Sequence, residues 1–196
     1  MTKGKLFIIS GASGVGKSTV LHRVMEQRKD LSFSVSATTR PPRPGEVEGK
    51  SYYFVTKERF EDMIAQNAFV EYDAHMGNYY GTPEKQLEEK MLVGSVILDI
   101  EPVGALNVRA KRPDATLIFI APPSQEELEQ RLRGRGDTAE DQILLRLERA
   151  RWEMEQSKLY DYIVTNDQVD ACAEKILNII AHVAVLSYIS SSPQST

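Results

Sequence analysis

A glycine-rich segment near the start of the chain constrains its fold and chemistry more than any other feature. Residues 11–18 read Gly-Ala-Ser-Gly-Val-Gly-Lys-Ser and match the phosphate-binding loop pattern G-x-x-x-x-G-K-[ST] at every fixed position. Glycine lets the backbone wrap closely around an oxyanion, so that consecutive N–H groups point at phosphate oxygens. Lys17 would bring a mobile positive charge to the β- and γ-phosphates, and the Ser18 hydroxyl would hold Mg²⁺. The residues predicted to contact the nucleotide are Gly11, Ala12, Ser13, Gly14, Val15, Gly16, Lys17, Ser18 and Thr19.

The segments on either side of this loop have the patterns of a strand and a helix. Residues 5–10 form a short apolar run that suits a buried strand, and apolar residues recur at helical spacing over residues 20–25. A helix that begins at the end of the loop adds its positive N-terminal end to the anion site. This context favours a nucleoside-triphosphate site over the alternative, a flexible Gly/Ser loop.

Composition narrows the class of protein. The 196 residues suit one compact unit with inserted lobes, and a hydrophobic content of 41% is enough for a core. A net charge of −4 argues against general nucleic-acid binding, which favours a basic surface. The single Cys172 excludes an internal disulfide, so the reducing cytoplasm is the predicted location. The three histidines are scattered without a Cys/His cluster, and no protein-bound transition metal is predicted.

Residues 176–189 are the most apolar stretch of the chain. They are shorter than a membrane span and contain Asn178 and His182. They predict a packed C-terminal helix, with burial against a partner subunit as the alternative. The first apolar run is too short for a signal peptide. We therefore expect no membrane association, and the oligomeric state, monomer or homodimer, stays open.

Between the first helix and residue 82 the sequence pattern is rich in short strands. The first helix is expected to end near residues 29–30, and Thr56 is expected to cap a helix that reaches about residue 65. Thr82 is expected to cap a further helix that has proline at its first position. The expected strands are residues 33–37, 52–55, 69–72 and 79–80. This part of the chain predicts an inserted β-rich lobe.

Strands and helices alternate over the remaining sequence. Ser124 opens a capping box, and glycines 134 and 136 end the basic helix that follows it. The expected strands are residues 95–99, 115–121 and 162–165, and the other expected helices are residues 103–111 and 138–158. Apolar strands separated by helices indicate an α/β fold with a parallel sheet covered on both faces.

Further residues have the chemistry of phosphate or metal binding. Arg40 and Arg43 lie three residues apart on a proline-stiffened loop and can grip a second phosphate; a solvated polyproline turn is the alternative. Asp99 ends a predicted strand, where it can organise Mg²⁺ or its waters. A cluster of arginines can close over a transferring phosphate, although at least two of its members are expected to be ordinary surface residues. The cluster is Arg131, Arg133, Arg135 and Arg146.

Beyond the phosphate loop, five segments in consistent order resemble the motifs of guanylate kinases. They are residues 33–47, 77–82, 98–101, 131–136 and 160–167. The resemblance implies a P-loop nucleoside-monophosphate kinase fold and transfer of a phosphoryl group from ATP to GMP with Mg²⁺. It also implies three parts, which are a core (1–32, 83–123 and 147–190), a GMP-binding lobe (33–82) and a helical lid (124–146).

The resemblance also assigns roles to single residues. Those that would hold the GMP phosphate are Ser36, Arg40, Arg43, Tyr52 and Tyr80. Those that would read or surround the guanine edge are Glu71, Thr82 and Glu101, with Asp99 beside them. Those that would stabilise the transferring group are Lys17, Arg40, Arg135 and Arg146. Asn166 lies where the family meets the adenine of ATP, while Ser51, Pro102 and Val103 depart from the family's usual residues.

Two other functions fit parts of this pattern. Guanylate-kinase-like domains also serve as non-catalytic interaction modules, but these tend to lose the phosphate loop, whereas Lys17 and Ser18 are intact here. A P-loop kinase for another small acceptor, such as a sugar phosphate, is the stronger alternative.

Overall fold

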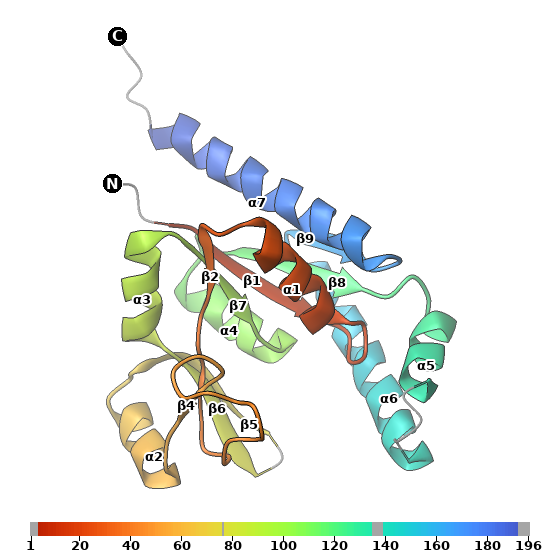
Figure 1. The fold of residues 1–196 in the computed structure, drawn as a ribbon, viewed down its shortest axis with the longest axis horizontal. Coiled ribbons are helices and arrows are strands. Elements are labelled where there is room, and N and C mark those ends of the chain that lie inside the picture. Colours follow the sequence, from red (N-terminus) through yellow and green to blue (C-terminus); the bar gives the residue numbers. More distant parts are fainter. Residues whose placement is uncertain (1–3, 76, 135–138, 192–196) are drawn as a thin grey trace. The chain divides into compact units, whose positions relative to one another are not determined.

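The computed structural model describes residues 4–75, 77–134 and 139–191 (Figure 1). The chain divides into two compact units, which are described separately. Unit 1 consists of Met1–Ile8 and Asp30–Ala115, and unit 2 consists of Ile9–Lys29 and Thr116–Thr196. The first strand, β1 (Leu6–Gly11), is fully buried and runs from unit 1 into unit 2.

A five-stranded sheet with the order β2-β7-β1-β8-β9 forms the predicted core. In unit 1, β2 (Leu31–Phe33) pairs in parallel with β7 (Ser95–Asp99). In unit 2, β8 (Thr116–Ala121) pairs in parallel with β9 (Tyr162–Thr165). Every residue of β8 is buried, as expected for a strand that has helices on both faces of its sheet. The prediction of an α/β fold with a parallel core sheet is confirmed.

Unit 1 contains a second sheet with the order β4-β3-β6-β5. The strands β5 (Phe69–His75) and β6 (Asn78–Pro83) form an antiparallel hairpin, and β3 (Ala37–Thr38) pairs antiparallel with β6. The short β4 (Tyr53–Phe54) pairs in parallel with β3. This sheet lies within residues 37–83, where the sequence predicts a β-rich lobe.

Packing of aromatic rings stabilises this second sheet. The helix α2 (Lys57–Ala65) buries Phe60, whose ring stacks on Phe69 at 4.4 Å and on Tyr79 at 5.2 Å between centroids. Thr56 caps α2 as predicted, because its hydroxyl accepts the N–H of Arg59.

Two predictions in this region are wrong. Residues 33–37 do not form one strand, because β2 ends at Phe33, Ser34 still donates its N–H to Ile97, and β3 begins only at Ala37 in the other sheet. Thr82 does not cap a helix either. It lies in β6, and α3 (Glu84–Val93) begins after Pro83 without a side-chain cap.

The helix α4 (Pro102–Lys111) completes the described elements of unit 1 and packs against β5. At its C-terminal end, Lys111 donates hydrogen bonds to the backbone carbonyls of Phe69 and Val70, at 3.3 and 2.7 Å. These contacts join the helix that follows β7 to the edge of the four-stranded sheet.

Unit 2 contains the remaining helices. The helix α1 (Lys17–Gln27) packs beside α7 (Val169–Ser191), and α1 ends two residues before the predicted position (Figure 1). Ser124 caps α5 (Gln125–Arg133) by accepting the N–H of Glu127, as the capping box predicts. The long helix α6 (Glu140–Gln156) is followed by a 3₁₀ turn, η1 (Ser157–Leu159). The predicted helix start at Thr138 lies outside the described residues.

The predicted C-terminal helix is confirmed as part of α7. Its first half buries Cys172, Ala173, Ile176 and Ile180, whereas Val185 and Leu186 are exposed. Within the described residues, no helix has both the length and the apolar character required to cross a membrane.

Candidate functional site

The phosphate loop of unit 2 has the backbone geometry of an anion site. Gly14 and Gly16 take φ angles of +87° and +90°, in the left-handed region that residues with a Cβ rarely adopt. Gly16 is the N-cap of α1, and the first turn of that helix contains no acidic residue. The positive end of the helix dipole and the N–H groups of the loop are therefore not offset by a carboxylate in that turn, which favours a bound phosphate.

Two side chains from distant segments hold the loop at Val15. The Nδ2 amide of Asn166 donates to the Val15 carbonyl at 2.8 Å, and Arg131 Nη1 donates to the same carbonyl at 3.4 Å. Asn166 is 2% exposed, and within the described residues its Oδ1 has no hydrogen-bond partner. A buried acceptor of this kind suits an amino group of a ligand. The predicted contact of Asn166 with adenine stays a prediction.

A third group of contacts reaches the loop at Ser13 and comes from α6. Arg146 Nε donates to the Ser13 hydroxyl at 3.4 Å, so the predicted Arg146 lies beside the loop. The N–H of Ser13 donates to Glu153 Oε2 at 2.6 Å, and Arg149 Nε donates to Glu153 Oε1 at 2.9 Å. Glu153 is completely buried. Sequence reasoning missed it, because one carboxylate among many charges on α6 carries no local sign of burial.

The other arginines of the predicted cluster differ in their surroundings. Arg133 is paired on the surface with Glu129 and Glu140, as expected for an ordinary helix-surface residue. Arg131 is paired with Glu127 on its own helix, in addition to its contact with the phosphate loop. Arg135 lies outside the described residues.

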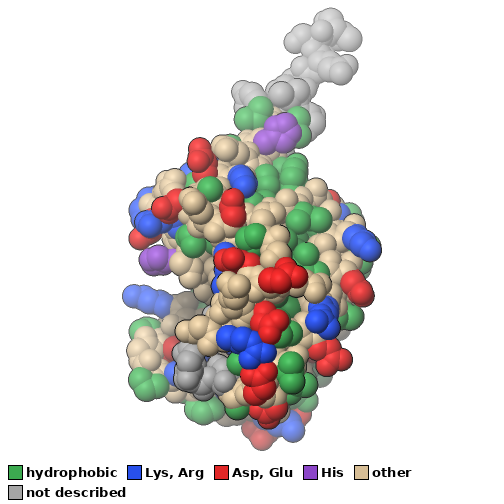
Figure 2. All heavy atoms as spheres, turned by 90° about the vertical axis from the view of Figure 1, so that its right-hand side faces the viewer, with side chains coloured by type: hydrophobic (Ala, Val, Ile, Leu, Met, Phe, Trp, Pro, Cys, Tyr) green, Lys and Arg blue, Asp and Glu red, His purple; other side chains and the backbone are tan. Residues whose placement is uncertain are grey.

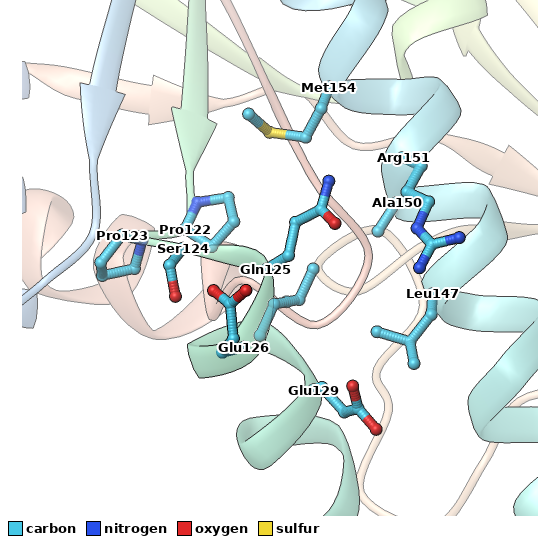
Figure 3. A pocket seen from close by; sticks show the side chains of 11 residues that line it. Pro122, Pro123, Ser124, Gln125, Glu126, Glu129, Leu147, Ala150, Arg151 and Met154 are labelled. Carbon is cyan, nitrogen blue, oxygen red and sulfur yellow. The ribbon is translucent and has the colours of Figure 1, made fainter.

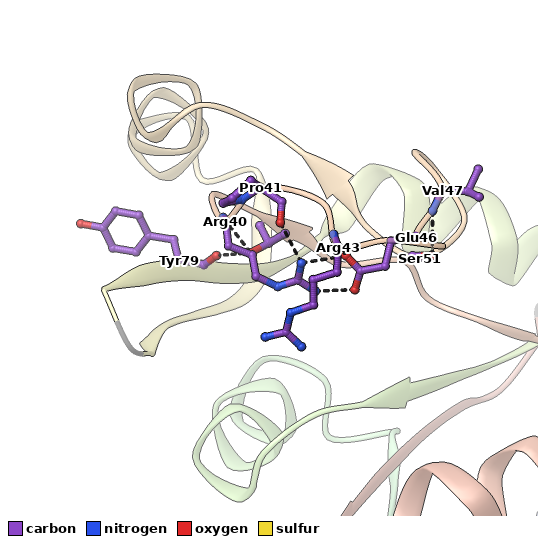
Figure 4. A network of polar contacts seen from close by, with 8 residues as sticks. Arg40, Pro41, Arg43, Glu46, Val47, Ser51 and Tyr79 are labelled. Atoms are coloured by element: carbon purple, nitrogen blue, oxygen red, sulfur yellow. Dashed lines mark hydrogen bonds and ion pairs between the residues drawn. The ribbon is translucent and has the colours of Figure 1, made fainter. Parts of the chain in front are cut away.

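In unit 1, Arg40 is held by a carboxylate that sequence reasoning also missed (Figure 4). Glu46 Oε2 and Oε1 accept from the two terminal nitrogens of Arg40 at 2.7 and 2.5 Å, and Glu46 Oε2 also accepts the N–H of Arg43 at 2.7 Å. The Arg40 guanidinium lowers the pKa of Glu46 to about 2, and this pairing raises the pKa of Arg40. Arg40 is only 9% exposed, which excludes the solvated polyproline turn for this residue, while Arg43 is exposed.

Aromatic rings complete the surroundings of Arg40. Its Cζ lies 5.1 Å from the centroid of the Tyr52 ring, and the rings of Tyr52 and Tyr80 meet edge to face at 6.1 Å. Burial raises the pKa of Tyr52, and the charge of Asp99 acts in the same direction. Ser36 is half-buried and accepts the N–H of Tyr53 with its carbonyl. The structure thus brings Arg40, Tyr52 and Tyr80 together.

Glu71 and Thr82 form a second polar pair in unit 1. The Thr82 hydroxyl donates to Glu71 Oε1 at 2.7 Å, and the two residues are directly opposite in the β5–β6 hairpin. Glu71 is 7% exposed, and burial raises the pKa of its carboxyl group. Tyr80 and Thr82 are two residues apart on β6, so their side chains point to the same face of the sheet. The carboxylate and the groups around Arg40 are therefore offered by one small sheet.

Asp99 and Glu101 lie on either side of Ile100, where the chain passes from β7 to α4. Asp99 is the last residue of the strand and Glu101 is the N-cap of α4, and both are exposed. Their predicted roles toward guanine and Mg²⁺ stay predictions.

The residues around α1 fit a magnesium ion that is held mainly by a nucleotide. Mg²⁺ is usually bound through one or two protein oxygens plus substrate phosphates. Ser18 is an exposed residue in the first turn of α1. In the part of the chain that the structure describes, no three His, Cys, Asp or Glu residues form an all-protein metal site.

A separate cavity of about 330 Å³ lies between α5 and α6 (Figure 3). Its walls combine the apolar side chains of Leu147 and Met154 with Glu126, Glu129 and Arg151. The predicted site residues are not part of its lining. On the face of the molecule in Figure 2, basic and acidic side chains are interspersed.

Comparison with known proteins gives consistent results. The family model of guanylate kinase matches residues 3–183. A guanylate kinase of Nostoc sp. is 48% identical over 174 residues, covering 88% of this chain and 87% of the relative. A guanylate kinase of Thermus thermophilus is 45% identical over 179 residues, covering 91% of this chain and 81% of the relative. A crystal structure of guanylate kinase from Anaplasma phagocytophilum superposes with a TM-score of 0.73 at 34% identity, covering 92% of this chain and 86% of that one.

Proposed function

This chain belongs to the guanylate kinase family, and we propose on that basis that it transfers the γ-phosphoryl group of ATP to GMP, giving ADP and GDP. One observation carries the proposal beyond family membership. The four-stranded sheet contains the buried carboxylate of Glu71, and on the same face lies Tyr80, whose ring contacts that of Tyr52 beside Arg40. Guanine presents two donors, N1–H and the 2-amino group, to a carboxylate, and a guanidinium suits the phosphate of the same nucleotide.

The chemistry requires positioning and charge neutralisation more than proton transfer. The attacking group is a phosphate oxygen, which is ionised near neutral pH because the second pKa of a phosphate monoester is about 6. No general base is needed. The two phosphates must approach to within about 3 Å in line, against their mutual repulsion. The residues proposed to offset that repulsion are Lys17, Arg40, Arg43, Arg135 and Arg146.

Magnesium is proposed as the accompanying ion, with Ser18 and Asp99 as its protein-side oxygens. When bound, it would neutralise negative charge that develops on the phosphates during the transfer. The phosphate loop binds and orients the triphosphate, while Glu71, Thr82 and Glu101 select the base. The division into core, GMP-binding lobe and lid is part of the same proposal, as is a cytoplasmic location.

An acceptor panel tests the function directly. ATP and Mg²⁺ are supplied with GMP, dGMP, AMP, UMP or a sugar phosphate, and ADP release is measured together with the phosphorylated product. We expect GMP to be preferred. A sugar phosphate that outperforms GMP, or an enzyme that is indifferent to the base, would contradict the proposal.

A loop variant in the same assay tests the site. Lys17→Met should lower kcat by roughly 10² or more, because the lost charge acts on the transition state. Circular dichroism and GMP binding should stay as in the wild type. Near-normal turnover in this variant would exclude the loop as the catalytic phosphate site.

A further inference from the structure

Glu153 is a buried carboxylate for which the reaction outlined above has no use. It lies near the C-terminal end of α6, and its side chain is completely buried. An ionised carboxylate inside a protein is costly unless it is paired and hydrogen-bonded, so its partners indicate why it is there.

The partners of Glu153 connect α6 to the phosphate loop. One oxygen accepts the backbone N–H of Ser13 at 2.6 Å, a short distance typical of a charge-assisted hydrogen bond. The other oxygen accepts from Arg149 Nε at 2.9 Å. Ser13 is 140 positions away from Glu153 in sequence, so this is a tertiary contact made at the third residue of the loop.

A second contact joins the same helix to the same loop residue. Arg146 Nε donates to the Ser13 hydroxyl at 3.4 Å. Positions 146, 149 and 153 are spaced i, i+3 and i+7, which places them on one face of α6. The backbone of Ser13 and its side chain are thus both held by this face.

Electrostatics argue that Glu153 positions the loop rather than contacting the nucleotide. A carboxylate that faced the phosphates would repel them, whereas here one oxygen is turned to Arg149 and the other to a loop amide. The Ser13 N–H is committed to Glu153 and is therefore not one of the donors offered to an anion. Because Ser13 is fixed in this way, the part of the loop that follows it, with its left-handed residues Gly14 and Gly16, begins from a defined position.

We propose that Glu153 is a positioning residue for the ATP side of the reaction. It fixes the first part of the phosphate loop through the Ser13 N–H and keeps the loop in register with Arg146 on α6. This inference deepens the proposed function and rests on it.

The test is Glu153→Gln, with Glu148→Gln as the matched control. The glutamine amide keeps one acceptor oxygen but presents a donor where the second is needed. We expect kcat/KM for ATP to fall roughly 10-fold to 100-fold, as for a small misplacement of reacting groups, with GMP affinity unchanged. Glu148 is exposed on the same helix, so its glutamine variant removes the same charge and should behave as the wild type.

The Ser13 amide supplies a readout that a purely structural role would not move. In the wild type its NMR resonance should be shifted downfield and protected from exchange. In Glu153→Gln the downfield shift and the protection should both decrease, because a neutral amide oxygen is a weaker acceptor than a carboxylate, while neighbouring helices keep their protection. Equal losses for ATP and GMP, an unaltered Ser13 amide, or an equal effect of Glu148→Gln would overturn the inference.

If Glu153→Gln does not fold, two variants of Arg149 test the proposal instead. Arg149 is 41% exposed, and Arg149→Met removes the hydrogen bond that Arg149 Nε donates to the buried carboxylate, so kcat/KM for ATP should fall selectively. Arg149→Lys keeps the charge and should restore most of the activity. Equal values of kcat/KM for ATP in Arg149→Met and Arg149→Lys would contradict the proposal. A wild type without GMP kinase activity would instead refute the proposed function.

Discussion

At the scale of single residues, two carboxylates lie beside the predicted phosphate sites, and each is paired with an arginine. Glu46 accepts from the two terminal nitrogens of Arg40 with its two carboxylate oxygens, and Glu153 is paired with Arg149. An arginine side chain carries about 2 kcal/mol of rotamer entropy, so fixing Arg40 in advance reduces the cost of ordering it when a phosphate binds. We therefore propose that Glu46 preorganises Arg40 for the predicted GMP phosphate site.

The first prediction at this scale concerns the choice of base. Glu71→Gln should weaken GMP binding by about 1.5–3 kcal/mol, the usual contribution of a charge-assisted hydrogen bond, and leave ATP binding unchanged. The amide offers guanine a donor where the carboxylate offers an acceptor. Calorimetric titration with each nucleotide measures both values. A loss shared equally by the two nucleotides would point to a folding defect.

The same assignment of Glu71 predicts the direction in which stability and GMP affinity change with pH. Burial raises the pKa of Glu71 above its ordinary 4.5. Between 4.5 and the pKa of the folded protein, the folded protein therefore binds a proton that the unfolded chain releases. The stability linked to this proton is complete below 4.5 and is lost as the pH rises through the folded pKa. If Glu71 accepts hydrogen bonds from guanine, GMP binding needs the ionised carboxylate, so the affinity for GMP should increase over the same pH range. Because the GMP phosphate itself titrates at about 6, the glutamine variant is the reference, and parallel profiles would contradict the assignment.

At the scale of elements, α4 contains a glycine, Gly104, at a position where the backbone conformation does not require glycine. Gly104 is buried in the helix without a positive φ, yet a Cβ there would lie 3.0 Å from Glu71 Oε2. The missing side chain makes room for the carboxylate that Thr82 also contacts. A helix that packs on β5 therefore helps to position the predicted guanine acceptor.

Gly104→Ala separates this role from helix stability. Alanine in a helix interior favours folding by about 1 kcal/mol over glycine, which offsets part of the strain, so thermal stability should change little. GMP affinity should nevertheless fall by about 0.5–1.5 kcal/mol, the cost of an off-rotamer Glu71. Asn107→Ala, at an exposed position of the same helix, is the control. Unchanged GMP affinity in Gly104→Ala would remove Gly104 from the site.

The elements also show what the sequence can and cannot predict. Apolar runs bounded by glycine, proline and capping residues predicted β7, β8, α2 and α5, because those signals are local. The alternation over residues 33–37 continues while the pairing partner changes from one sheet to the other, and local pattern does not encode the partner. Thr82 has the sequence of a cap, but its hydroxyl serves Glu71, eleven residues away.

The candidate site follows the same rule. Residue type and spacing predicted the phosphate loop and Arg40, whereas Glu71 was predicted only from the resemblance to guanylate kinases. Their supports came from elsewhere in the chain. Glu153 and Asn166 reach the loop from 140 and 151 positions away, and no spacing rule connects such pairs.

At the scale of the whole molecule, the two predicted anion sites lie in different units, since the phosphate loop is in unit 2 and Arg40 and Arg43 are in unit 1. Glu46 already offsets the charge of Arg40, whereas Arg43 is exposed in unit 1 and Arg146 belongs to unit 2. We propose that the positive charge of these arginines disfavours approach of the two sites while they are empty. Two bound nucleotides supply the negative charge that allows these arginines to converge. We therefore predict that the lobe (33–82) and the lid (124–146) close on the core when both nucleotides are bound, with hinges near Ser32, Thr82 and Pro123.

Small-angle scattering measures this closure. The radius of gyration of the apo protein should exceed the value of about 16 Å expected for a compact chain of this length, and a non-transferable bisubstrate mimic should bring it closer to that value. An ATP analogue alone is the control and should compact the protein less, because it neutralises only one of the two clusters. Raising the salt concentration should reduce the difference between the apo and bound forms, since screening weakens the repulsion that separates the empty lobes. A radius of gyration that is the same with and without the mimic would favour a rigid binding module and count against phosphoryl transfer by closure.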